Sequence, residues 1–153
     1  MRRKDKEITD RQAIEEILEK SDVIRLAMVD DGEPYLVALN HAYAGGCLYV
    51  HSAKEGRKVD ILKKNNKVAF QADIDVGIVL NEEAARCTTR YQSVFGTGRA
   101  SLLEDRDSKV KALDAIMSKH APKMGKVYPD NVLDAMLIIK IEIETMTGKK
   151  SGY

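Results

Sequence analysis

The segment LIIKIEIET, residues 137–145, alternates between apolar and charged or polar side chains. Successive side chains on a β-strand point to opposite faces of a sheet. One face of this strand is apolar, with Leu137, Ile139, Ile141, Ile143 and Thr145, and the other carries Lys140, Glu142 and Glu144. The pattern predicts a strand with one buried face and one wet face, which is typical of antiparallel sheets.

Several β-prone segments precede this strand. Shorter strands are predicted over residues 23–29, 35–43, 47–51 and 68–72, and a longer one over 90–103. Gly96 and Gly98 interrupt the long strand, which indicates a bulge or a close approach by another group. Residues 75–85 begin with strand-like alternation and end like a loop, so the pattern there does not decide between the two.

Three helices are predicted, over about residues 10–20, from residue 52 to about residue 65, and over about 106–119. Thr9 with Gln12, and Ser52 with Glu55, form capping-box patterns at the first two. Hairpin-connected strands with three peripheral helices favour a mainly β fold, an antiparallel barrel of six or seven strands. We expect one domain over residues 1–153, with a charged, flexible tail over residues 1–8.

The composition disfavours nucleic-acid-binding, membrane-spanning and disulfide-rich classes of protein. The 153 residues carry a net charge of +1, with 25 basic and 24 acidic side chains, so no overall field attracts nucleic acid or an anionic membrane. No apolar run predicts a signal peptide or a membrane span. Cys47 and Cys87 are too few for a disulfide scaffold. We therefore expect a cytoplasmic protein.

The segment HSAKEGRKVDIL, residues 51–62, places Arg57 and Lys58 near the start of a predicted helix. Cations at that end of a helix are disfavoured by roughly 0.3–1 kcal/mol each. A solvated helix face is one interpretation of the pair. The other is a phosphate site, because free backbone N–H groups, the Ser52 hydroxyl and two cations together form a positively charged pocket.

Other chemistry is less well supported. His41, Cys47 and His51 are close in sequence, but Cys47 and His51 on one strand would lie roughly 13 Å apart, so no metal site is predicted. Gly96-Thr97-Gly98 lies within a strand and does not open a helix, so it is not a dinucleotide-binding fingerprint.

Three segments resemble the pyridoxamine 5′-phosphate oxidase-like superfamily, and the similarity extends over about residues 8–150. The first resembles its flavin-phosphate segment: LYVHSA (48–53), GRK (56–58), Leu62 and Asn65-Asn66. The second, YQSVFGTGRA (91–100), resembles its second flavin-contacting strand, and the third, IEIETMTGK (141–149), its closing strand. The form of residues 51–56 is most similar to the nitroimidazole-resistance branch.

The resemblance implies a split β-barrel that binds flavin mononucleotide (FMN) at the interface of a homodimer. It implies that Arg57 and Lys58 bind the phosphate, and that His51, Ser52 and Ala53 line the ribityl chain or the ring. Ser93 and Val94 would approach the ring from the second strand. Val37, Leu39 and Asn40 would face it from the strand of residues 35–43. His51 is also the candidate catalytic residue, and its alternative interpretation is a hydrogen-bonded structural histidine.

The implied activity is that of a flavin-dependent oxidoreductase, which passes electrons from a small-molecule donor to a small acceptor such as a nitroaromatic compound. Pyridoxamine phosphate oxidation itself is not expected, because the C-terminal arginine-containing substrate motif has no counterpart in TGKKSGY (147–153). Two alternatives remain: a flavin carrier or sensor without turnover, and a haem-binding relative with His51 or His41 as axial ligand. A nucleic-acid-binding barrel is disfavoured by the net charge and the 5% aromatic content.

Overall fold

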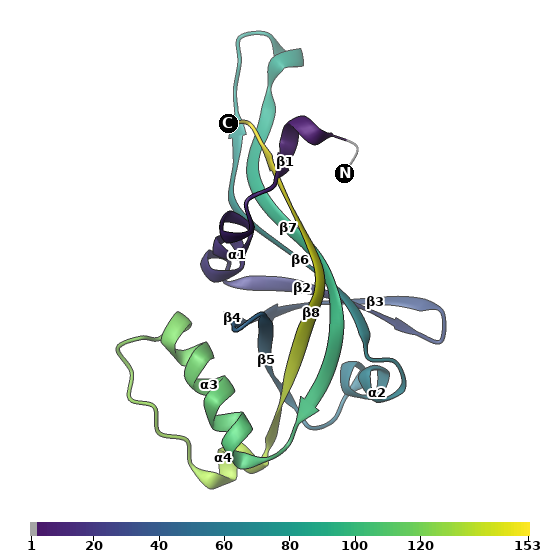
Figure 1. Ribbon diagram of the computed structural model, residues 1–153, viewed down its shortest axis with the longest axis vertical. Coiled ribbons are helices and arrows are strands. Elements are labelled where there is room, and N and C mark those ends of the chain that lie inside the picture. The colour runs from purple at the N-terminus through teal and green to yellow at the C-terminus, as the bar shows by residue number, and fades with distance from the viewer. Residues whose placement is uncertain (1–2) are drawn as a thin grey trace.

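The computed structural model describes residues 3–153, which form one antiparallel sheet of eight strands that curls into a barrel (Figure 1). The order across the sheet is β3-β2-β6-β7-β8-β5-β4, and β1 pairs with β8. The strands are β1 Glu7–Ile8, β2 Val23–Asp30, β3 Glu33–Asn40, β4 Ala42–Ala44, β5 Cys47–Ala53, β6 Lys67–Val79, β7 Thr88–Leu103 and β8 Met136–Ser151. β3, the first strand of this order, also contacts β5, the last but one. The predicted mainly β, antiparallel barrel is confirmed.

Within residues 3–153, four α-helices lie outside the sheet: α1 Arg11–Lys20, α2 Arg57–Lys64, α3 Arg106–His120 and α4 Asp130–Asp134. Short 3-10 turns occupy Lys4–Lys6 and Ala84–Arg86. The three predicted helices are all present. The sequence pattern missed α4 and β1 because five and two residues are too few to show a period. The predicted strand 35–43 is in fact two strands, β3 and β4, which break at His41.

Both predicted capping boxes were wrong. The N-cap of α1 is Asp10, whose carboxylate accepts a hydrogen bond from the Gln12 N–H at 3.2 Å. α2 begins five residues after Ser52, because β5 continues to Ala53 and the side chain of Ser52 is buried in the barrel. The helix can start only after the chain has left the sheet.

The segment that the sequence left undecided is a hairpin arm. β6 runs on to Val79, and pairs such as Ile78 with Thr89 join it to β7. The arm extends beyond the rest of the barrel at the top of Figure 1. Apolar side chains alternate along this two-stranded ribbon, but Val76, Ile78 and Leu80 are exposed, so the ribbon has no buried face. The alternation therefore indicated a strand, while the polar residues that follow indicated a loop.

The glycines of β7 mark a bulge and a close approach, as predicted. The pairing of β7 with β8 shifts register between Thr97 and Gly98. A Cβ atom on Gly96 would overlap the ring of Phe70 and lie 2.6 Å from the Thr145 carbonyl oxygen. Only glycine lets the central strands approach this closely without displacing a neighbour.

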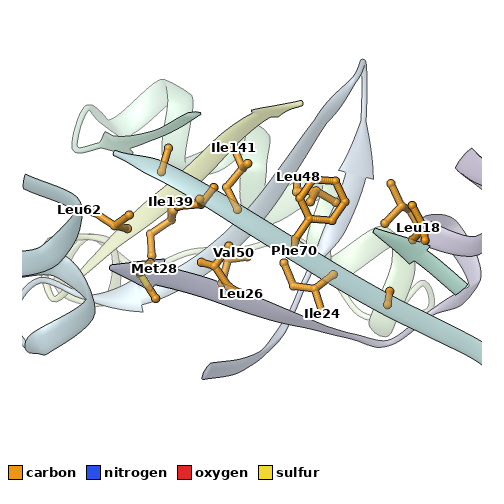
Figure 2. Packing of buried hydrophobic residues seen from close by; sticks show 14 of the residues in the cluster. Leu18, Ile24, Leu26, Met28, Leu48, Val50, Leu62, Phe70, Ile139 and Ile141 are labelled. Atoms are coloured by element: carbon orange, nitrogen blue, oxygen red, sulfur yellow. The ribbon is translucent and has the colours of Figure 1, made fainter. Parts of the chain in front are cut away.

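The main core fills the barrel and draws on almost every strand. Figure 2 shows apolar side chains from β2, β5, β6 and β8 pointing toward one another, with Leu18 and Leu62 packed from α1 and α2. The members with no measurable exposure include Ile24, Leu26, Leu48, Ile139 and Ile141. The face of β8 that the sequence predicted to be apolar therefore supplies the centre of the barrel.

A smaller apolar cluster lies under α3 and includes Ala42, Leu113 and Ile116. The residue before Ala42, His41, is also fully buried, and its Nε2 lies 2.9 Å from the Leu18 carbonyl oxygen and 3.3 Å from Lys119 Nζ. Lys119 also donates to the carbonyl oxygens of Leu18 and Ser21. The last turn of α3 is thereby held against the last turn of α1.

His41 is expected to make the fold sensitive to mild acid. Burial, and next the charge of Lys119, lower the pKa of His41 from 6.5 to about 4. In the unfolded chain His41 binds a proton near pH 6.5, whereas in the folded protein it stays neutral until about pH 4. The free energy of unfolding is therefore at its full value above pH 6.5 and decreases as the pH drops toward 4, by up to about 3 kcal/mol. Urea unfolding between pH 7.5 and 4.5 measures the loss. His41→Gln should flatten that part of the curve, and an unchanged curve would place the acid sensitivity elsewhere.

Part of the expected N-terminal tail is ordered by β8. Glu7 pairs with Lys149, and Lys6 Nζ donates to Ser151 Oγ at 2.7 Å. Residues 4–8 thus form a turn and a short strand in place of a flexible tail, because β8 extends past its predicted end at Thr145 and offers a free edge. Residues 1 and 2 lie outside the described residues.

Candidate functional site

The N-terminus of α2 presents open hydrogen-bond donors. Gly56 precedes the helix with a φ of 123°, and no side chain of residues 3–153 caps this end. The first bonds into the helix come from the N–H groups of Val59 and Asp60, which both donate to the Gly56 carbonyl. The N–H groups of Arg57 and Lys58 therefore remain directed out of the helix end, where an anion is stabilised.

The two predicted phosphate-binding cations differ in their surroundings. Lys58 is half-buried at the first turn. Arg57 is open to solvent, but its Nε donates to Asp30 Oδ2 at 3.1 Å and its guanidinium lies over the Tyr35 ring, 4.7 Å from the centroid. Arg57 is therefore a positioned guanidinium beside free backbone N–H groups, an arrangement that can bind a phosphate group.

The end of β5 presents its predicted site residues on alternating faces. The His51 side chain is exposed on the outside of the barrel, and Ala53 is exposed at the strand end. Ser52 points inward and is 3% exposed, and its hydroxyl donates to its neighbour's carbonyl, Ala53 O, at 2.9 Å. His51 is thus available to a ligand, whereas the Ser52 hydroxyl is already used within the fold.

β7 carries the second predicted pair. Val94 is fully buried in the main core, so its side chain packs within the barrel and is not open to a ligand. Ser93 faces outward and is half-buried, with its hydroxyl 3.5 Å from the Lys149 carbonyl oxygen. Phe95 follows on the same outer face and is 52% exposed.

β3 supplies the remaining predicted residues. Val37 and Leu39 are half-buried on the face that packs toward the core, and Asn40 is exposed at the strand end. Tyr35, two residues before Val37, is on the same half-buried face and contacts Arg57. Through this contact β3 adjoins the start of α2.

A single chain does not bring all the predicted site residues together. On β8, His51 pairs with Ile138 and Ser93 pairs with Lys149, eleven residues further on. At about 3.3 Å per residue these positions are roughly 35 Å apart along the strand. β8 runs along the long axis of the molecule in Figure 1, so the two groups lie toward opposite ends of the chain's fold.

Other candidate chemistry finds less support. Residues 3–153 contain no group of three or more histidine, cysteine or acidic side chains arranged to hold a metal ion. His41 is buried beneath α3 and is closed to a haem, whereas His51 is open. Among the helices that the structure describes, none has the length and apolar character to cross a bilayer.

Sequence reasoning missed Asp30 and Tyr35. Asp30 lies between two predicted strands, and Tyr35 is the first residue of the second of them, so neither position indicated a role in the site. Their contacts with Arg57 join residues more than twenty positions apart, and no local pattern reports such a contact. The unusual placement of a cation at a helix start was the one available signal that a partner exists.

Comparison with known proteins decides the family. A family model described as pyridoxamine 5′-phosphate oxidase matches residues 10–150. The chain belongs to the pyridoxamine 5′-phosphate oxidase family. The resemblance identified from the three sequence segments is thus confirmed.

Relatives of this family member cover nearly its whole length. An uncharacterized protein of Rhizobium meliloti (strain 1021) is 33% identical over 144 residues, 93% of each chain. A structure of a Bacteroides thetaiotaomicron protein assigned to 5-nitroimidazole antibiotic resistance is 31% identical, with a TM-score of 0.85 over 94% of this chain and 86% of that one. A structure of an FAD-binding protein from Mesorhizobium loti is 26% identical, with a TM-score of 0.68 over 94% and 96%.

Proposed function

We propose that this family member binds FMN and acts as a flavin-dependent oxidoreductase on a small acceptor. The observation that carries the proposal is the start of α2, where Arg57 and Lys58 stand beside uncapped backbone N–H groups. This site offers charge-assisted bonds to a terminal phosphate, which FMN has and riboflavin lacks. Similarity to a protein assigned to nitroimidazole resistance supports a nitroaromatic acceptor.

The residues present fit the cofactor. Arg57, Lys58 and the helix end would hold the phosphate, while Val37, Leu39, Asn40, His51 and Ala53 would face the ribityl chain and ring. Flavin, when bound, supplies the electron-transfer chemistry between a small-molecule donor and the acceptor. The protein's part is to fix the ring and to control which molecules reach it.

We further propose that the site is shared between two copies of the chain. Ser93 and His51 lie roughly 35 Å apart along β8, too far for both to touch one flavin within a single chain. A second copy that places its β7 beside the first copy's β5 would bring both groups to the same ring. We also propose a cytoplasmic location, because Cys47 and Cys87 are both free thiols.

The absorption spectrum and the oligomeric state together test this function. The purified protein, loaded with FMN, should show a flavin spectrum and sediment as a dimer with about one flavin per chain. It should oxidise NADH or NADPH when a nitroaromatic compound is supplied. Tight flavin binding without turnover would favour a carrier or sensor, and a Soret absorption band would favour a haem protein. A monomer that binds one flavin per chain would contradict the shared site.

His51 is the proposed catalytic side chain, because it is exposed at the end of β5, six residues before Arg57. His51→Ala should lower turnover about 10²–10⁴-fold if the His51 imidazole donates a proton or a hydrogen bond to the flavin or the substrate. Because the side chain is not part of the core, the melting temperature should change by only a few degrees. Steady-state assays and thermal melts measure both quantities. Unchanged turnover with reduced stability would assign His51 a structural role.

A further inference from the structure

Arg57 is held from two sides by residues of the β2–β3 hairpin. Asp30, at the end of β2, accepts a hydrogen bond from Arg57 Nε at 3.1 Å. Tyr35, early in β3, places its ring beneath the guanidinium, with the Arg57 Cζ 4.7 Å from the centroid. Together they restrict the rotation of the long Arg57 side chain before any ligand binds. Less conformational entropy is then lost when a ligand does bind.

The contacts leave most of the guanidinium's donors available. An arginine side chain has five N–H bonds, one on Nε and four on the two Nη atoms. Asp30 uses the Nε–H, and Tyr35 contacts the face of the planar group without using any N–H. The four Nη hydrogens stay open for a phosphate, which arginine binds in a bidentate way.

The charge of Asp30 is itself balanced by α2. Lys64, the last residue of α2, has its Nζ 4.0 Å from Asp30 Oδ1 and 3.4 Å from Asp31 Oδ2. The Asp30 side chain is 23% exposed, whereas that of Asp31 is 83% exposed. Because a cation neighbours each oxygen of Asp30, its negative charge repels an incoming phosphate only weakly.

We propose that Asp30 and Tyr35 are positioning residues that fix Arg57 for the phosphate of the flavin nucleotide. The inference rests on the proposed FMN site and adds the source of its selectivity: the phosphate meets a guanidinium that is already oriented. The alternative role for Asp30 is that of a competitor, a carboxylate that occupies Arg57 in place of phosphate. The use of Nε, with both Nη groups left open, favours positioning.

The test compares two neighbouring carboxylates of the same turn. Asp30→Ala should weaken FMN binding about five- to tenfold, because Arg57 must then be ordered at the moment of binding. Affinity for riboflavin should not change. Asp31→Asn is the matched control, since Asp31 pairs with Lys64 and not with Arg57, and its φ of 51° is one that asparagine tolerates. This control should bind both flavins as the wild type does.

Two further variants separate positioning from a purely structural role. Asp30→Asn keeps the shape of the side chain and removes its charge, so it should weaken FMN binding by about two- to fourfold even if Asp30→Ala folds poorly. Tyr35→Phe retains the ring and should preserve the FMN preference, whereas Tyr35→Leu should reduce it. A loss of stability alone would not alter the ratio of FMN to riboflavin affinity.

Fluorescence titration of each apoprotein with FMN and with riboflavin gives the ratio. Tighter FMN binding by Asp30→Ala would overturn positioning and make Asp30 a competitor for Arg57. A wild-type ratio in both Asp30 variants would show that the carboxylate only ties α2 to the hairpin, and would also overturn it. If the wild type itself binds FMN and riboflavin equally, the proposed phosphate site fails before the role of Asp30 arises.

Discussion

Replacing both Arg57 and Lys58 by alanine is expected to weaken FMN binding about a hundredfold and to leave riboflavin binding nearly unchanged. Charge-assisted hydrogen bonds contribute roughly 1.5–3 kcal/mol each. Two of them at a partly exposed site give about 3 kcal/mol, which corresponds to the hundredfold change. Titration of wild type and double variant with both flavins measures it. Equal affinities for FMN and riboflavin in the wild type would make the pair ordinary surface charge.

The same double variant has a second, smaller effect on the empty protein. From the sequence, removal of two cations at a helix start should stabilise the apoprotein by up to about 1 kcal/mol for each. The structure changes this expectation for Arg57, whose bonds to Asp30 and Tyr35 offset the unfavourable dipole. We therefore expect Lys58→Ala alone to stabilise the apoprotein slightly, and Arg57→Ala alone to leave it unchanged or slightly less stable. Thermal melts of the single variants are the measurement.

Phe70→Ala is expected to lower the free energy of unfolding by about 3–5 kcal/mol. The ring is 1% exposed at the centre of the main core and lies against the backbone of Gly96 on the paired strand. Its removal leaves a cavity that the glycine cannot fill. Urea denaturation of the apoprotein should show the loss as a lower midpoint.

The chain offers a matched control for this change. Phe95 is the only other phenylalanine, is 52% exposed, and is on the outer face of the neighbouring strand. Phe95→Ala should cost about 1 kcal/mol or less. Equal losses from the two substitutions would contradict the placement of Phe70 at the centre of the barrel.

The sequence predicted well wherever one element has one regular period. Ile139 and Ile141 alternate with charged residues, and the structure buries both completely while Glu142 and Glu144 stay exposed. The other face of the strand is not wet throughout, because Ile138 is buried there in the smaller cluster under α3. The prediction failed where two local rules compete. Ser52 and Glu55 have the spacing of a helix cap, but the buried side chain of Ser52 keeps that residue in the sheet, and the helix starts later.

The candidate site was only partly predictable for a different reason. Arg57 and Lys58 could be singled out from their position at a helix start. Their surroundings could not, because the contact with Asp30 spans 27 positions and depends on how the hairpin packs against α2. The roughly 35 Å between Ser93 and His51 along β8 likewise becomes visible only when the register of three strands is known.

The pairing of β8 also bears on how the chain reaches its fold. This strand is the last of the eight described, yet it pairs with β1, β5 and β7, and its contacts with β1 join Glu7 to Lys149. Contacts between residues so distant in sequence slow folding, because the loop must close before the pairing repays its entropy. During synthesis the earlier strands would wait with an open edge on β5 and β7, exposed to pairing with other chains until β8 emerges from the ribosome.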